Sequence, residues 1–406
     1  MKRITFLLLL ALSIAGSSSS QTGNNTNATT MNNQPRKGNW VPGEDYAVYD
    51  RVRILDQMGF TQPQEAYSVL VPKGWKSEGN VFWIGPGNTC AGTYRQMRAN
   101  SPDGKYSFHM MPDQLYMWNT DPQMQQFYQN NGNGNGMCTM MQPMNAETYL
   151  RNVFARELGG AKVISVENNQ AVVDFMRQMN AKAMSELQSY GAGQMSFDQT
   201  ALNAVVKWND GTEGLITLGV TIIATQVPNQ YTGTSTQIFT TQVTKRTVFR
   251  YAASESAKAK QMFSVIMSSF HTNPVWNDAV NSFWLQARQR SNTVHIGKIK
   301  AMDEQTRRMG EQAVKNGQQR LNSMDNDSRT WERTQNSQDR MHTEFIKTIR
   351  EVENFRDETG KYEMTAGYNH AWSRGDGTSF VLSNNPNFNA ASVFQDQNWK
   401  PMKKVD

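Results

Sequence analysis

The side chains best suited to chemistry in this 406-residue sequence are sulfur ligands gathered in two short stretches. Together with one histidine they form the following set of candidate metal ligands: His109, Met110, Met111, Met137, Cys138, Met140, Met141 and Met144. Thioether and thiolate groups suit Cu(I), so one hypothesis is a site that handles a soft metal. The alternative is packing, because methionine fills irregular cores and the chain contains 24 methionines. The sequence favours packing, and no cofactor is expected.

The chain has two cysteines, Cys90 and Cys138. In an oxidising compartment two thiols can pair, and this pair would close a long loop. Pairing requires that the two Cα atoms lie within about 7 Å of each other, which the sequence leaves open. Two cysteines at this spacing do not form a structural zinc site.

The sequence lacks the short motifs that mark common enzyme active sites. Its five histidines do not occur with metal-ligand spacing or beside a nucleophile motif, so no catalytic residue is assigned. A Ser–His–Asp site can still assemble from residues far apart in the chain, which keeps a hydrolase with an unrecognised site as an alternative. The prediction leans toward a protein that is not an enzyme.

Three aromatic side chains lie close together near the C-terminus: Tyr368, His370 and Trp372. Such a cluster is typical of the core of a small tail unit or of its docking face. A binding surface formed by these three residues is the alternative.

The N-terminus has the parts of a secretory signal. Basic residues at positions 2 and 3 precede an apolar run from Phe6 to Gly16, and four serines follow. The run is too short to span a membrane, which takes about 20 apolar residues, and no later stretch is long and apolar enough. We therefore expect a secreted or periplasmic protein after cleavage, with no transmembrane segment in the mature chain.

The charge of the chain is mild. Its formal net charge is +6, and the segment from Arg288 to Arg350 carries most of the excess that remains after cleavage of the signal. A small excess without a concentrated patch does not predict a nucleic-acid partner.

The pattern of apolar residues predicts an α+β fold with a mainly antiparallel sheet and packed helices. The strands Ala204–Trp208 and Leu215–Val227 flank a turn of Asn209, Asp210, Gly211 and Thr212, and the strand Thr236–Tyr251 follows. The predicted parts are a signal peptide (1–20), a disordered Asn/Thr-rich linker (21–43), an α+β domain (45–272), a helical segment (273–355) and a small β-hairpin tail unit (356–406).

The helical segment should begin with Asn273 as the cap and Pro274 in the first turn. Its first helix has an apolar face formed by Trp276, Val280, Phe283, Trp284 and Ala287. The polar remainder should dock on the sheet domain or on a partner. In the tail, Lys361–Met364 and Ser379–Leu382 are predicted to form the hairpin.

The segment from Trp331 to Asn389 resembles the tail of a family of secreted bacterial proteins without an assigned activity. The stretches that carry the resemblance are Ser337–Arg340, Ile349–Glu353, Phe355–Asp357, Gly367–Ser373 and Leu382–Asn389. The strand Tyr67–Trp75 resembles the start of the same family. The front domain also resembles the α/β sandwich of PsbP-like proteins, which implies a fold and not a function.

These observations favour a secreted, periplasmic or envelope protein that acts as a non-enzymatic binding or scaffolding module. Its partner would be an unknown envelope protein or surface partner. Cu(I) handling and an unrecognised hydrolase site are the two alternatives.

Overall fold

The computed structural model describes residues 39–86, 88, 90–130, 138–189, 195–228, 235–291, 308, 352–357, 360–365 and 367–405. The predicted signal peptide, most of the predicted linker and most of the polar helical segment lie outside these residues. The described residues belong to one compact unit, Gly38–Asp406.

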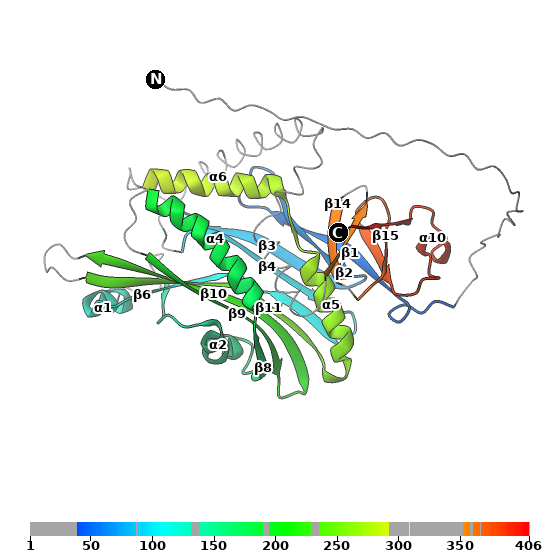
Figure 1. Ribbon diagram of the computed structural model, residues 1–406, viewed down its shortest axis with the longest axis horizontal. Helices are drawn as coiled ribbons and strands as arrows, with labels where there is room; N and C mark the ends of the chain where they lie inside the picture. Colours follow the sequence, from blue (N-terminus) through cyan, green and yellow to red (C-terminus); the bar gives the residue numbers. More distant parts are fainter. Residues whose placement is uncertain are drawn as a thin grey trace, which may run out of the picture. The chain divides into compact units, whose positions relative to one another are not determined.

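The larger sheet of the described chain has nine strands in the order β3-β4-β5-β11-β10-β9-β8, with β6 beside β11 and β7 beside β6. Its strands are β3 Lys76–Ile84, β4 Gly92–Asn100, β5 Tyr106–Met110, β6 Gln114–Asn119, β7 Thr139–Met140, β8 Lys162–Asn168, β9 Met195–Lys207, β10 Thr212–Pro228 and β11 Ser235–Ala252. The long antiparallel strands β9, β10 and β11 confirm the meander predicted from the sequence (Figure 1). The turn between β9 and β10 forms as expected, because Gly211 takes a φ of 85° and Asp210 accepts a hydrogen bond from the Thr212 backbone.

A second sheet joins the beginning of the described chain to its end. Within the described residues it has six strands in the order β12-β2-β1-β16-β15-β17. They are β1 Tyr46–Asp56, β2 Gln64–Pro72, β12 His271–Thr272, β15 His370–Ser373, β16 Ser379–Ser383 and β17 Lys400–Pro401. A third, three-stranded sheet in the described tail consists of β14 Gly360–Thr365, β13 Val352–Asp357 and β18 Lys403–Val405.

This topology corrects the predicted tail unit at 356–406. Lys361–Met364 does not pair with Ser379–Leu382, because β14 pairs with β13 while β16 lies between β1 and β15. The end of the predicted helical segment is also wrong, since Val352–Asp357 is a strand. Phe380 and Leu382 are fully buried together with Tyr49 of β1, so burial against a distant strand sets the pairing.

Helices cover both faces of the long strands. The described helical elements are α1 Pro122–Asn130, α2 Ala146–Tyr149, the π-helix η1 Leu150–Phe154, α3 Ala155–Glu157, α4 Gln170–Ser189, the 3₁₀ turn η2 Ala253–Glu255, α5 Ser256–Ser268, α6 Pro274–Ser291 and α10 Ala390–Val393. On β9, Ala201 packs with α4, whereas Leu202 belongs to the core cluster of α2 and η1. Neighbouring strand residues point to opposite faces, so α4 and α2 cover opposite faces of this sheet (Figure 1).

The arrangement of these elements confirms the α+β class with mainly antiparallel sheets. The central core lies where α5 and α6 pack between the two large sheets, around residues such as Tyr67, Phe108 and Phe263. Among the described helices, none has the length and apolarity needed to cross a bilayer.

Candidate binding clefts

A cleft of about 600 Å³ lies beside α6, and we call it the α6 cleft. Its walls come from α6, from the start of β4, from β11 and from the loop around Cys90. The lining residues used below are Arg95, Gln242, Asn277, Asn281 and Trp284. Ligand sites commonly have volumes of about 300–1,000 Å³, so the cleft has the size of a small-molecule site.

Helix α6 is started by the cap that the sequence predicts. The Asn273 side chain accepts a hydrogen bond from the Val275 backbone at 3.0 Å, and Pro274 occupies the first turn. The predicted apolar face is buried, with Trp276 and Phe283 each 4% exposed. Asn277 and Asn281 are four residues apart and lie on a stripe beside this face. They line the cleft together with Trp276, Val280, Trp284 and Ala287 of the apolar face.

The buried carboxylate of Asp56 holds two tryptophans, of which Trp276 lines the cleft. One oxygen accepts the indole N–H groups of Trp83 and Trp276, each at 2.9 Å. The other accepts the backbone N–H groups of Met58 and Gly59. Asp56 therefore fastens the end of β1 to β3 and to α6 at a site with no solvent exposure.

Trp284 itself has a fixed orientation. Its indole stacks on Trp83 with a centroid distance of 5.9 Å, and its N–H donates to the Thr93 hydroxyl at 2.8 Å. An aromatic wall held in this way loses little conformational freedom when a ligand binds.

Three carboxamides on the wall of the cleft have no hydrogen-bond partner among the described residues: Gln242, Asn277 and Asn281. The nearby guanidinium of Arg95 is partly used, since it donates to Thr272 at 3.2 Å and lies 5.7 Å from the ring centroid of Tyr67. Each carboxamide offers both a donor and an acceptor. Within the described residues, the cleft therefore presents several polar groups without a protein partner and one positive charge.

A disulfide borders the α6 cleft. Cys90 and Cys138 are bonded with a Cα–Cα distance of 5.2 Å, which settles the pairing that the sequence left open. Asn88 and Ala91, on either side of Cys90, line the cleft, and Asn88 accepts a hydrogen bond from the Cys90 backbone. The disulfide therefore holds the loop that forms one rim of the cleft.

A second cleft, the α5 cleft, has a volume of about 630 Å³ and is lined by parts of β1, α5 and the tail. Lys73 and Lys258 line this cleft, and neither forms an ion pair with another described residue. Tyr368 also lines it.

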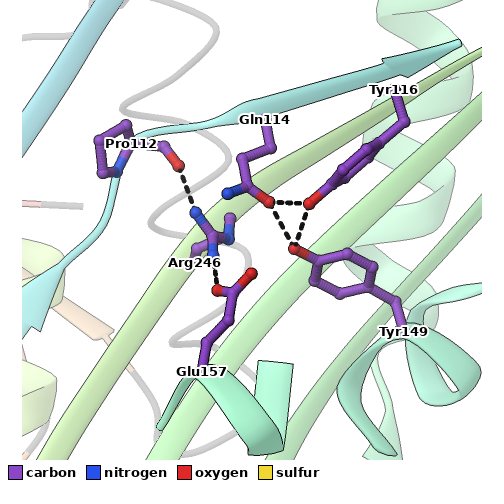
Figure 2. Close-up of polar contacts among 6 residues, drawn as sticks. All are labelled: Pro112, Gln114, Tyr116, Tyr149, Glu157 and Arg246. Atoms are coloured by element: carbon purple, nitrogen blue, oxygen red, sulfur yellow. Dashed lines mark hydrogen bonds and ion pairs between the residues drawn. The ribbon is translucent and has the colours of Figure 1, made fainter. Parts of the chain in front are cut away.

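A buried arginine, Arg246, stands at the centre of a polar cluster between the sheet and α3 (Figure 2). Arg246 pairs with Glu157, donates to the carbonyl of Pro112 at 3.0 Å, and lies over the ring of Phe154. A β-bulge with a φ of 55° at Lys245 precedes it, and the extra residue turns the Arg246 side chain toward the helices. The cluster ties α3 to the sheet, and the guanidinium Nε of Arg246 is a buried atom without a hydrogen-bond partner.

Two tyrosines complete this cluster. Tyr116 and Tyr149 both donate to the side-chain oxygen of Gln114, as Figure 2 shows. Burial raises the pKa of both phenols above the ordinary value, so they stay protonated as donors. The neighbouring His109 accepts a hydrogen bond from Arg98 at 3.2 Å. Burial, together with the charges of Arg98 and Arg246, lowers the pKa of His109 to about 4.

The structure does not gather the candidate metal ligands into one site. Met110 is buried in the core beside α5, whereas Met111, Met141 and Met144 pack against the separate core of α2 and η1. Cys138 is in the disulfide, Met140 lies in β7, and Met137 falls outside the described residues. His109 faces two arginines, which disfavour a cation. The described part of the chain also has no group of three or more His, Cys, Asp or Glu residues that could hold a metal ion.

The aromatic residues of the tail do not form one binding surface. Tyr368 packs into the core around Phe355 and Phe380, whereas Trp372 packs against Phe388 in a separate cluster. His370 is partly exposed beside Trp372. Burial is the physical reason for this correction, since both large rings are at most 8% exposed.

The polar wall of the α6 cleft could not be predicted from the sequence. Asn277 and Asn281 have the spacing of one helical stripe, which was the available signal, but exposed asparagines on a helix are common. Arg95 and Gln242 come from separate strands and meet α6 only in the folded chain.

A comparison with protein-family models finds no match to the chain, and a comparison with curated proteins finds no similar sequence.

Proposed function

We propose that the chain is a secreted or envelope protein that binds a ligand reversibly in the α6 cleft. The observation that carries this proposal is the set of three carboxamides that have no hydrogen-bond partner among the described residues and lie on the wall of the cleft, beside a fixed tryptophan. A ligand that pairs with such groups gains orientation and specificity from them. No acid, base or nucleophile in the cleft takes part in this proposal, which describes a binding module and not an enzyme.

The proposed location is supported by two independent features. The N-terminal residues have the pattern of a cleavable secretory signal. The Cys90–Cys138 disulfide is consistent with an oxidising compartment outside the cytoplasm.

Amide hydrogen exchange of the mature protein, with and without a soluble extract of the cell envelope, tests the proposal. We expect the extract to slow exchange in α6 and at the start of β4. The double variant Asn277→Ala/Asn281→Ala should lose this protection. Gln286→Ala is a matched control, because Gln286 is an exposed carboxamide on the same helix that does not line the cleft.

Two results would contradict the proposal. One is that the extract leaves amide hydrogen exchange in α6 and β4 unchanged. The other is that the extract slows exchange equally in the wild-type protein and in the double variant.

A further inference from the structure

We infer that the ligand of the α6 cleft is a carbohydrate, in the form of a short oligosaccharide, and this inference rests on the proposed function. The wall of the cleft combines planar polar side chains with an indole, and each of these matches a different feature of a sugar ring. The polar groups match hydroxyls, and the aromatic ring matches the apolar C–H face.

The three carboxamides of the cleft match the hydroxyls of a sugar. A sugar hydroxyl donates one hydrogen bond and accepts others, and neighbouring hydroxyls on a ring repeat this pattern. Gln242, Asn277 and Asn281 each present an N–H donor and a C=O acceptor in one plane, so each can bind a pair of neighbouring hydroxyls.

The indole of Trp284 matches the apolar C–H face of a sugar. Trp284 lines the cleft and is held by its stack on Trp83 and its bond to Thr93. Trp83 stacks against the ring and the indole N–H is already used, so the part of the ring that borders the cleft offers apolar contact rather than a further donor. A sugar ring has hydroxyls and an apolar C–H face, and an aromatic ring beside polar side chains can contact both.

The same residues disfavour other classes of small ligand. A phosphate or nucleotide is normally bound by several cations or backbone N–H groups, whereas Arg95 is the one cation among the lining residues that the structure describes. An acyl chain would leave the three carboxamides buried without partners, which weakens binding. Arg95 also permits an acidic sugar, since its guanidinium is only partly used.

Isothermal titration calorimetry with three pure probes tests this inference first: cellotetraose, chitotetraose and tetragalacturonate. We expect at least one of them to bind, and Asn277→Ala/Asn281→Ala to weaken that binding at least tenfold. Gln286→Ala should bind like the wild-type protein. Binding that is equal in the double variant would overturn the inference.

Periodate treatment of the envelope extract then covers sugars outside this set of probes, because periodate cleaves neighbouring diols. If treatment removes the protection of α6 measured by hydrogen exchange, the ligand is a carbohydrate. If protection survives periodate but is lost in Asn277→Ala/Asn281→Ala, the proposed binding function stands and the carbohydrate inference fails. If the untreated extract gives no protection and none of the probes binds, both fail.

Discussion

Removal of the Cys90–Cys138 disulfide should destabilise the protein strongly. The bond closes a loop between residues 48 apart, and the chain-entropy model then gives about 4 kcal/mol at 25 °C. The loop includes β4, β5, β6 and α1, so the whole region gains freedom when the chain unfolds without the bond. We therefore expect Cys90→Ala/Cys138→Ala to unfold at a clearly lower urea concentration.

The assay is urea denaturation followed by tryptophan fluorescence, with three samples compared: wild type, reduced wild type and the double variant. Reduced wild type and the variant should agree, because both lack the covalent link. Hydrogen exchange should also rise at the rim of the α6 cleft around Asn88 and Ala91, and should stay unchanged at the α5 cleft. A loss of less than about 1 kcal/mol would refute this reasoning, as would two free thiols in the protein as isolated.

Three further predictions concern Asp56, His109 and the N-terminal signal. Asp56→Asn should reduce the free energy of unfolding by about 2–3 kcal/mol, because an amide nitrogen would face N–H donors in a buried site. Urea denaturation measures this loss, and Asp198→Asn at an exposed position is a control that should leave the stability unchanged. His109 has a lower pKa in the folded chain than in the unfolded chain, so unfolded protein binds the proton more tightly and stability should fall as the pH drops from 6.5 toward about 4. The loss should be about 1–2 kcal/mol after solvent screening at this half-buried site, and His109→Gln should remove this part of the pH dependence in thermal melts at pH 7 and pH 4.5. Mass spectrometry of cell fractions from the native source should find the protein outside the cytoplasm and shortened by roughly its first twenty residues. A full-length product in the cytoplasm would contradict the proposed location.

The local parts of the fold could be predicted from the sequence. The turn at Asp210–Gly211 has residues that suit its backbone, and Asn273–Pro274 has the side chains of a helix start. Both signals depend on neighbours in the chain, and the structure contains the β9–β10 hairpin and the start of α6 where they were expected.

The long-range parts could not be predicted. Tyr49 pairs with Phe380, more than 300 residues away, and nothing in either strand identifies the other as its partner. The same limit applies to the site, because Arg95, Gln242 and Asn277 come from three elements that meet only in the folded chain. Closeness in the sequence did not predict a shared cluster in the tail, since Tyr368 and Trp372 pack in two separate cores.

The most direct test of ligand binding in the α6 cleft is a variant that fills the cleft. Asn277→Trp places a large side chain in the space between α6 and β4, whereas Gln286→Trp adds the same side chain to an exposed position on the same helix. We would measure by calorimetry the affinity of both variants for the oligosaccharide or purified extract component that binds the wild-type protein. We predict that Gln286→Trp keeps the wild-type affinity and that Asn277→Trp shows no binding while retaining the wild-type melting temperature. Wild-type affinity in a folded Asn277→Trp protein would place the ligand elsewhere and contradict the account.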